Sequence, residues 1–418
     1  MLNVVYVSPY YGAMTPRFVA ALAQTPGVRL SLVRTGTLAG LGPSLRKRIA
    51  ADYRVDNCFD VDELAEAVQW LGNALGGVHR LIATYEQLQV PVADVRERLG
   101  IEGMGGEAAR NFRDKARMKE VLRAAGLPVA KHARVESVAD GVAFGEEVGF
   151  PLVLKPLAGA GSVATLRVED AAELRRLLEQ ACPTAASPWQ CEEFITGRER
   201  SFEAISVDGD PVFASLTRYD PPPLHVLENP WIQWTVLLPR EIERPAYNET
   251  RRIGFAALKA LGMTTAMSHM EWFRRPDGSI VIGEVAARPP GAMILQQLSY
   301  AHDTPFLPRW ADLMVNNRFS LPPRKYAAGA AFFRAQGPGA GGGGGRIVGI
   351  EGLAEAQKRV GHLVVEANLP RVGQFTRSSY EGEGQAVVRH EDTAVVEEAL
   401  ATLISTVRII CSDKPQDP

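Results

Sequence analysis

Residues 267–291 read MSHMEWFRRPDGSIVIGEVAARPPG and contain two runs with the pattern of strands. The runs are Met267–Arg274 and Ser279–Val285. Between them, Pro276-Asp277-Gly278 is a strong turn signal, because proline presets one turn position and glycine accepts the next. The segment therefore predicts a tight β-hairpin.

Two glutamates and an arginine in this hairpin are candidates for chemistry. Glu271 lies in the middle of the first strand and Glu284 late in the second, so both carboxylates can point to one side of the sheet. Converging carboxylates are the hard oxygen ligands that Mg²⁺ on nucleotide phosphates requires. Arg288 could meet the charge of a transferring phosphoryl group. The alternative is a pair of solvated surface glutamates, against which the apolar surroundings argue.

Lys155 ends an apolar strand candidate, Leu152–Lys155, and a loop of small residues, Ala158–Ser162, follows it. A lysine in that position is seldom buried without an anionic partner. Small residues let backbone N–H groups approach phosphates, although most loops of this kind are only turns. The lysine, the loop and the hairpin together favour a nucleotide site.

Two further segments fit the same kind of site. The strand candidate Gln190–Ile195 could bind an adenine edge, and Glu199, beyond a glycine turn, could accept two ribose hydroxyl groups. The alternative is a surface strand with charged ends. Lys115 lies near the start of an amphipathic helix predicted over Phe112–Ala125, where a lysine is more often solvated.

The hydrophobic pattern divides the chain into four parts. Strands alternate with helices over roughly residues 1–110, which predicts a parallel, doubly wound sheet. Residues 112–195 form an α+β block, and residues 201–285 are mostly strands with wide loops, including a proline-rich loop at 220–235. A tail domain follows. Its Gly341–Gly345 run is predicted to be a hairpin tip, because no strand–GKS/T–helix context surrounds it.

Composition argues against several classes of function. Lys and Arg number 46 and Asp and Glu 48, a formal charge of −2, so a nucleic-acid binder is not expected. The four cysteines are far apart and indicate neither a zinc site nor a disulfide framework. No apolar run of about 18 residues occurs, and the N-terminus lacks the features of a signal peptide. We therefore expect a cytoplasmic protein with no membrane partner.

Four motifs occur in an order that resembles the ATP-grasp superfamily. They are a DK-x-x-x-K helix ending in GLP, a VLKP strand with a GAGS loop, EEFITGRE, and the hairpin HMEWF…GEVAARPPG. The chain looks most like the amino-acid ligases and is similar in layout to the biotin-carboxylase-like branch. The resemblance implies an N-terminal doubly wound α/β domain at 1–111 and a mobile lid at 112–198. A central metal-binding subdomain at 199–325 and a C-terminal α+β extension at 326–418 complete the expected ATP-grasp fold.

The resemblance also implies roles for individual residues. The expected catalytic residues are Lys155 and Arg288, and the expected Mg²⁺ ligands, with Mn²⁺ as an alternative ion, are Glu271 and Glu284. Ala286 stands where many members have a metal-binding asparagine, so one of two ions is expected to be held less fully. The expected ATP-binding residues are Lys115, Lys155, Gly159, Gly161, Ser162, Glu192, Glu193, Phe194, Ile195 and Glu199.

The implied activity is that of an ATP-dependent carboxylate–amine ligase, which forms an amide or peptide bond on amino acids or a related small carboxylate. The reaction passes through an acyl-phosphate and releases ADP and phosphate. The expected partners are a small carboxylate and a small amine, and a homodimer remains open. The alternatives are a bicarbonate-using carboxylase and a non-catalytic nucleotide-binding module. Biotin carboxylase follows its arginine with Q-V-E-H, whereas Pro289-Pro290-Gly291-Ala292 follows Arg288, which argues against the carboxylase.

Three residues are candidates for substrate contacts. Glu86 follows the strand candidate Leu81–Thr84, at the edge of the first sheet where α/β proteins bind ligands. His269 shares a strand face with Glu271, because side chains two residues apart on a strand align. Trp231 lies on the proline-stiffened loop and could wall a pocket. The alternatives are a structural histidine, and tryptophans that pack as core anchors.

Overall fold

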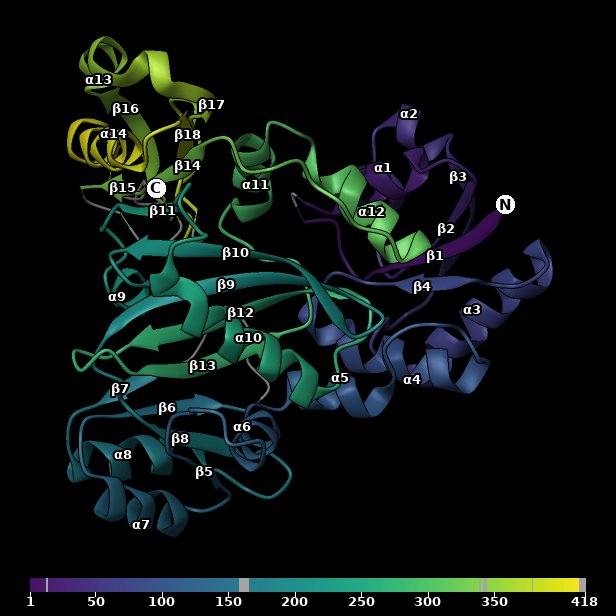
Figure 1. The fold of residues 1–418 in the computed structure, drawn as a ribbon, viewed down its shortest axis with the longest axis horizontal. Helices are drawn as coiled ribbons and strands as arrows, with labels where there is room; N and C mark the ends of the chain where they lie inside the picture. Colours follow the sequence, from purple (N-terminus) through teal and green to yellow (C-terminus); the bar gives the residue numbers. More distant parts are fainter. Residues whose placement is uncertain (13, 158–164, 338–339, 341–343, 378, 413–418) are drawn as a thin grey trace, which may run out of the picture.

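Figure 1 shows the protein as a computed structural model. The structure describes residues 1–412 except 13, 158–164, 338–339, 341–343 and 378. Within these residues the strands form four sheets, of four, four, eight and three strands. The mixed α/β class predicted from the sequence is confirmed.

The N-terminal unit is a parallel sheet with strand order β3-β2-β1-β4. Val4 and Tyr6 of the central strand β1 pack into one core, whereas Val5 and Val7 pack into another. A parallel strand buried on both faces belongs to a sheet covered by helices on both sides, as predicted. The elements of this unit are β1 (Leu2–Ser8), α1 (Thr15–Gln24), β2 (Val28–Arg34), η1 (Leu38–Gly40), α2 (Pro43–Arg46), β3 (Ile49–Arg54), α3 (Val61–Leu75), β4 (Arg80–Ile82), η2 (Glu86–Leu88), α4 (Gln89–Leu99) and α5 (Gly106–Arg113).

The second unit is a small antiparallel sheet, order β5-β8-β6-β7, with helices α7 and α8 against it (Figure 1). Its core joins Leu152 and Leu154 of the sheet to Leu174 and Leu178 of α8. Helix α6 leads into the sheet from the N-terminal unit. The elements are α6 (Lys115–Ala124), β5 (His132–Val135), α7 (Val138–Val148), β6 (Leu152–Pro156), β7 (Leu166–Val168), α8 (Ala171–Ala181) and β8 (Trp189–Glu193).

The single helix predicted over Phe112–Ala125 is wrong, because the chain breaks at Asp114. This residue has φ −88° and ψ 110°, outside the helical region. Its Oδ1 atom accepts hydrogen bonds of 3.0 Å from the backbone N–H groups of Ala116 and Arg117. Asp114 is therefore the N-cap of α6, which begins at Lys115.

The central sheet has eight antiparallel strands in the order β13-β12-β9-β10-β11-β14-β18-β17. The hairpin predicted over residues 267–291 forms one edge of it, as β12 and β13. The proline-rich segment predicted as a loop contains a short helix, α9, which begins at a proline where the missing N–H costs nothing. The elements here are β9 (Arg198–Val207), β10 (Asp210–Asp220), α9 (Pro223–Glu228), β11 (Trp234–Leu238), η3 (Pro245–Tyr247), α10 (Asn248–Leu261), β12 (Ala266–Arg274), β13 (Ile280–Ala286), α11 (Ile294–His302) and α12 (Phe306–Asn316).

Strand alternation sorts the side chains of the central sheet onto two faces. Phe202 and Trp272 point to one face and pack in the core that α10 covers. Glu203 and Glu271, each one position away, point to the opposite face. The first face anchors the sheet under α10. The opposite face packs Ile205 and Met267 into another core and carries the polar side chains farther along the same strands.

The C-terminal extension continues this sheet, since β14, β18 and β17 follow β11 in hydrogen-bonded order. The predicted boundary at residue 326 therefore falls just before a strand of the central sheet, and the four domain ranges stay predictions. Positions 341–343 of the predicted glycine hairpin tip lie outside the described residues. The elements are β14 (Ala327–Phe333), β15 (Ala335–Gln336), β16 (Arg346–Glu351), α13 (Leu353–Val360), η4 (Gly361–Leu363), β17 (Val364–Asn368), β18 (Gly384–His390), α14 (Thr393–Thr406) and β19 (Arg408–Ser412).

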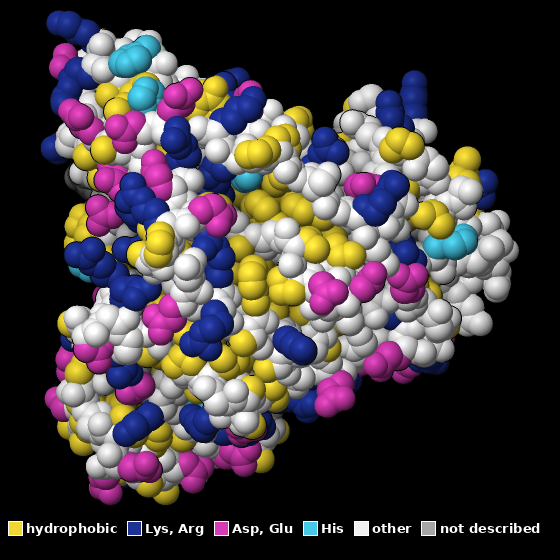
Figure 2. All heavy atoms as spheres, in the orientation of Figure 1, with side chains coloured by type: hydrophobic (Ala, Val, Ile, Leu, Met, Phe, Trp, Pro, Cys, Tyr) yellow, Lys and Arg dark blue, Asp and Glu magenta, His cyan; other side chains and the backbone are white. Residues whose placement is uncertain are grey.

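Several exclusions made from composition can be compared with the structure. Cys58, Cys191 and Cys411 are buried, Cys182 is exposed, and all four are free thiols. In the part of the chain that the structure describes, no helix has the length and apolarity needed to span a bilayer. Basic and acidic side chains are interspersed on the face drawn in Figure 2.

Gly254→Ala in α10 should lower stability, although alanine favours a helix by roughly 1 kcal/mol over glycine. A Cβ atom at position 254 would lie 2.6 Å from the ring of buried Phe202, and overpacking costs about 1–3 kcal/mol. The midpoint of urea unfolding, followed by circular dichroism, measures the change. Gly72→Ala in α3 is the control: its nearest neighbour would be 3.6 Å away, so the midpoint should rise. An unchanged midpoint for Gly254→Ala would contradict the packing of α10.

Candidate functional site

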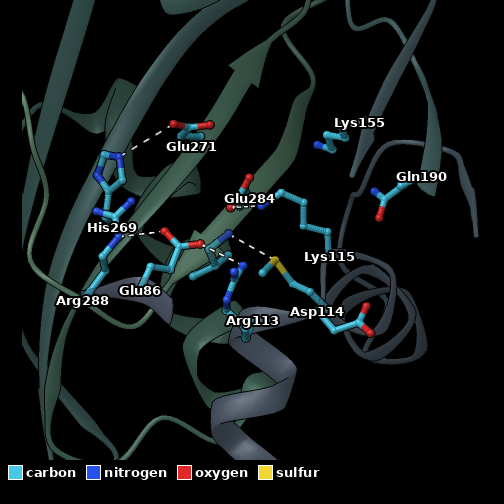
Figure 3. Close-up of polar contacts among 12 residues, drawn as sticks. Glu86, Arg113, Asp114, Lys115, Lys155, Gln190, His269, Glu271, Glu284 and Arg288 are labelled. Carbon is cyan, nitrogen blue, oxygen red and sulfur yellow. Dashed lines mark hydrogen bonds and ion pairs between the residues drawn. The ribbon is translucent and has the colours of Figure 1, made fainter. Parts of the chain in front are cut away.

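The two hairpin glutamates lie directly opposite each other on adjacent strands. Figure 3 shows Glu271 and Glu284 on the same face of the sheet, with Lys115 and Lys155 pointing toward them. Lys115 Nζ is 2.5 Å from Glu284 Oε1. The side chains of Glu271 and Glu284 are 32% and 23% exposed, so they are not the solvated pair of the alternative interpretation.

The charges of the two carboxyl groups are not equally compensated. Burial raises the pKa of Glu271, and the neighbouring charge of Glu284 raises it further. Burial also acts on Glu284, but the charges of Lys115 and Lys155 outweigh it and lower its pKa to about 2. Glu271 is therefore the member of the pair that a further cation would stabilise most.

Lys155 on β6 meets a buried glutamate of β8. Its Nζ atom lies 2.8 Å from Glu192 Oε1, and Lys119 Nζ lies 3.0 Å from the same oxygen. Burial alone would raise the pKa of Glu192, but the charges of Lys119 and Lys155 lower it to about 2. We assigned Lys119 no role from the sequence. The sequence does contain an indication of its position: Lys119 lies four residues after Lys115, and this spacing places both lysines on one face of the helix.

A cavity of about 330 Å³ lies between the small sheet and the hairpin. Burial and the charge of Glu271 raise the pKa of Glu199, in its wall, to about 8. Gly159, Gly161 and Ser162 lie outside the described residues. The remaining predicted ATP-binding and metal residues all line this cavity: Lys115, Lys155, Glu192, Glu193, Phe194, Ile195, Glu199, Glu271 and Glu284.

The Glu193 carboxylate is held by other parts of the chain. Its Oε1 atom accepts hydrogen bonds from Arg275, at 2.9 Å, and from the backbone N–H of Lys131, at 3.1 Å. Glu192 is likewise occupied by the two lysines. An adenine edge at this strand would therefore meet backbone groups, and not these carboxylates.

A second cavity, of about 140 Å³, adjoins the first and shares Glu271 and Glu284 with it. Its wall contains Arg288, His269 and the aromatic side chains of Trp234 and Tyr380. Tyr380 comes from the C-terminal extension and stacks obliquely on Trp234, with 5.4 Å between the ring centroids. The sequence carried no signal for Tyr380, since no motif surrounds it.

Arg288 is held in this second cavity by Glu86 from the N-terminal unit. Arg288 Nε donates a hydrogen bond of 2.9 Å to Glu86 Oε2, and Arg113 Nη1 lies 3.4 Å from Glu86 Oε1. Glu86 is 6% exposed. Because its carboxylate already binds two guanidinium groups, the predicted contact to a substrate amine is not supported.

His269 shares the face of Glu271, as predicted. The imidazole ring of His269 contacts the buried carboxylate of Glu203. His269 Nδ1 lies 3.0 Å from Glu203 Oε1, and its Nε2 lies 3.9 Å from Glu271 Oε1. Glu203 is fully buried and also accepts hydrogen bonds from the hydroxyl groups of Ser201 and Thr217. The ring therefore has a fixed orientation at the wall of the second cavity.

Trp231 does not lie where the sequence analysis placed it. The side chain is 56% exposed and lines neither cavity. Trp234 is the tryptophan of this segment that reaches the second cavity, and it is 1% exposed. The strand β11 buries Trp234, whereas Trp231 precedes that strand.

The hairpin carboxylates are a small set of donors for a metal ion. Among the described residues, no group of three or more His, Cys, Asp or Glu side chains could hold a metal. Two opposed carboxylates fit a hard divalent cation that takes its other ligands from phosphate oxygens and water.

Comparison with known proteins agrees with this geometry. The sequence profile described as "Carbamoyl-phosphate synthase L chain, ATP binding domain" matches residues 114–203. An L-arginine-specific L-amino acid ligase of Bacillus subtilis is 27% identical over 229 residues, which cover 54% of this chain and 54% of that protein. An alanine–anticapsin ligase of Bacillus subtilis (strain 168) is 28% identical over 221 residues, 47% of this chain and 45% of that protein. The chain thus spans about half the length of these curated relatives.

A solved structure has the same fold over the whole chain. The L-amino acid ligase from Bacillus licheniformis superimposes with a TM-score of 0.76 at 18% identity, covering 99% of each chain. The profile match, the relatives and the shared fold agree with the motif order and the cavity that gathers it. The chain has the fold of an ATP-grasp ligase, and its residues 114–203 match the profile of an ATP-binding domain.

Proposed function

We propose that the protein is an ATP-dependent carboxylate–amine ligase that acts on amino acids or a related small carboxylate. The observation that carries the proposal is the position of the Glu271–Glu284 pair on the wall shared by two adjoining cavities. Lys115 and Lys155 line the first cavity and Arg288 lines the second. This arrangement suits a nucleotide in the first cavity, a carboxylate in the second, and phosphoryl transfer between them. We call the first the nucleotide cavity and the second the acyl cavity. The names of the relatives, which are amino-acid ligases, support the same class.

Glu271 and Glu284 would hold Mg²⁺, or Mn²⁺ in its place, which when bound neutralises and orients the nucleotide phosphates. The opposed carboxylates fit this group, since Glu271 lacks a lysine of its own while Glu284 has Lys115. With the ion on Glu284, the ammonium group of Lys115 would turn from this carboxylate to the phosphates.

In the proposed reaction, an oxygen of the substrate carboxylate attacks the γ-phosphorus of ATP, and the bond to the β–γ bridging oxygen breaks to release ADP. Lys155 offsets charge on the nucleotide side, and Arg288 offsets it on the acyl side. The amine then attacks the acyl carbon, loses a proton, and expels phosphate. The chain supplies position and charge, so it needs no nucleophilic side chain.

Helix α9 forms part of the wall of both cavities. Leu224 and His225 line the nucleotide cavity, and Pro223 and Leu227 line the acyl cavity. We assign α9, together with the small antiparallel unit, the exclusion of water, which would otherwise hydrolyse the acyl-phosphate. The proline-rich segment, predicted as a loop, contributes this helix to both walls.

The protein is incubated with Mg-ATP, with and without pooled amino acids, and the products of ATP are analysed. ADP and phosphate should be released only when the amino acids are present. With carboxylate-¹⁸O₂ substrate, one labelled oxygen should appear in the released phosphate, because that oxygen attacks phosphorus. Mass spectrometry should find a condensed product. Release stimulated by bicarbonate alone would favour the carboxylase, and AMP with pyrophosphate would contradict the acyl-phosphate.

Glu284→Gln should lower kcat by about 100-fold or more, because it removes an anionic oxygen ligand at the reacting phosphate. Circular dichroism should show an unchanged fold. Glu249→Gln, at an exposed position of α10, is the matched control and should retain full activity. An active Glu284→Gln enzyme would refute the assignment of this carboxylate.

Glu86→Gln should lower kcat by roughly 10- to 100-fold, because an amide no longer fixes the guanidinium of Arg288. The affinity for ADP, measured by isothermal titration calorimetry, should not change, since Glu86 does not line the nucleotide cavity. Glu66→Gln, an exposed glutamate of α3, is the control. Weaker ADP binding at unchanged kcat would contradict the positioning role.

A further inference from the structure

Four arginines lie on the face of the central sheet opposite the nucleotide cavity. Arg200 on β9 is directly opposite Arg218 on β10, and Arg198 on β9 is opposite Arg274 on β12. Alternation along β9 places Arg198 and Arg200 on the face away from Glu199. Like charges in directly opposite positions destabilise a sheet. An anion bound beside the array would offset this repulsion.

Carboxylates of the chain offset this charge only in part. Glu397 on α14 lies 2.6 Å from Arg218 Nη1, but its side chain is 49% exposed, and so exposed a pair contributes little. Arg274 donates to backbone carbonyl groups. Across the described ranges, no ion pair joins Arg198 or Arg200 to a carboxylate.

One hydrogen-bond donor of Arg218 is unsatisfied in the described structure. Its Nη1 donates to Glu397 and its Nη2 to the Tyr247 hydroxyl oxygen, at 2.9 Å. Its Nε is buried and has no hydrogen-bond partner among the residues that the structure describes. Although burial raises the pKa of Tyr247, the hydrogen bond and charge of Arg218 and the charge of Arg200 outweigh it and lower that pKa. The local potential is thus positive, and a buried donor is unsatisfied.

Three of these arginines, Arg198, Arg200 and Arg218, line one end of a groove of about 580 Å³ between strands β9–β11 and helix α14. The rest of its wall has an apolar part, formed by Leu237, Leu400 and Ile404, and also contains the polar residues Glu199, Tyr219, Asp220, Thr235 and Glu397. We propose that this groove is a second ligand site, which binds a small organic oxyanion. The oxyanion head accepts hydrogen bonds from Arg218 Nε and the Arg200 guanidinium, and the apolar part packs against α14.

The site adjoins the nucleotide cavity, since Gly197, Glu199 and Pro222 line both. Arg200 and Glu199 are neighbours on β9 with side chains on opposite faces. A ligand that draws Arg200 toward the groove therefore acts on the strand that carries Glu199. Binding of a ligand in the groove should change the affinity of the protein for ADP severalfold.

Calorimetric titration of the full chain, with ADP present to occupy the nucleotide cavity, tests the site. The probes are hexanoate, hexyl phosphate, inorganic phosphate and, as the uncharged control, hexan-1-ol. At least one hexyl anion should bind about tenfold more tightly than inorganic phosphate, and hexan-1-ol should not bind. The comparison of hexanoate with hexyl phosphate tells which oxyanion the site prefers.

Three variants locate the binding. Arg218→Met should weaken it at least tenfold, and Arg252→Met, at an exposed position of α10, should leave it unchanged. Glu397→Gln should tighten it severalfold, because Arg218 loses its competing carboxylate. This gain cannot come from misfolding, so it keeps the test valid if Arg218→Met is unstable. Absence of binding by every anionic probe, or an affinity that neither Arg218→Met nor Glu397→Gln changes, would overturn the proposal.

Discussion

The strand register that sets Glu271 opposite Glu284 is the constraint on which the candidate site depends. Two carboxylates in opposed positions repel each other, and the chain offsets the repulsion with cations from other elements. Lys115 comes from α6 and contacts Glu284, while Lys155 comes from β6 and is shared with Glu192. The charge balance thus links the small antiparallel unit to the central sheet, and it leaves Glu271 with the least compensation.

Alternation along the central strands gives the sheet two different faces. The face with Glu203, His269 and Glu271 borders the two adjoining cavities. The other face buries Phe202 and Trp272 beneath α10 and carries the arginines farther along the strands. One strand such as β9 therefore contributes to the nucleotide cavity and to the groove beside α14. This shared strand is the physical reason to expect communication between them.

The second cavity is assembled from three regions of the chain. The hairpin and the segment after it supply the carboxylates and Arg288, the N-terminal unit supplies Glu86 behind that arginine, and the C-terminal extension supplies Tyr380. The extension can do so because its strands continue the central sheet beyond β11. A substrate in this cavity would therefore be enclosed by parts of the chain that no single motif covers.

Local sequence determined the hairpin, the doubly wound N-terminal sheet and most of the helices, although the cap at Asp114 was missed. The order of the motifs, through the family resemblance, indicated residues that line the nucleotide cavity. Turn chemistry, capping and strand alternation act over a few residues, so they can be read without the fold. Only the tertiary structure decided which groups share a charge. Lys115 meets Glu284 across 169 residues, and Glu86 meets Arg288 across 202. The same holds for Tyr380 in the second cavity and for Arg198 opposite Arg274, because pairing between strands far apart in the sequence follows from packing, which no local pattern records.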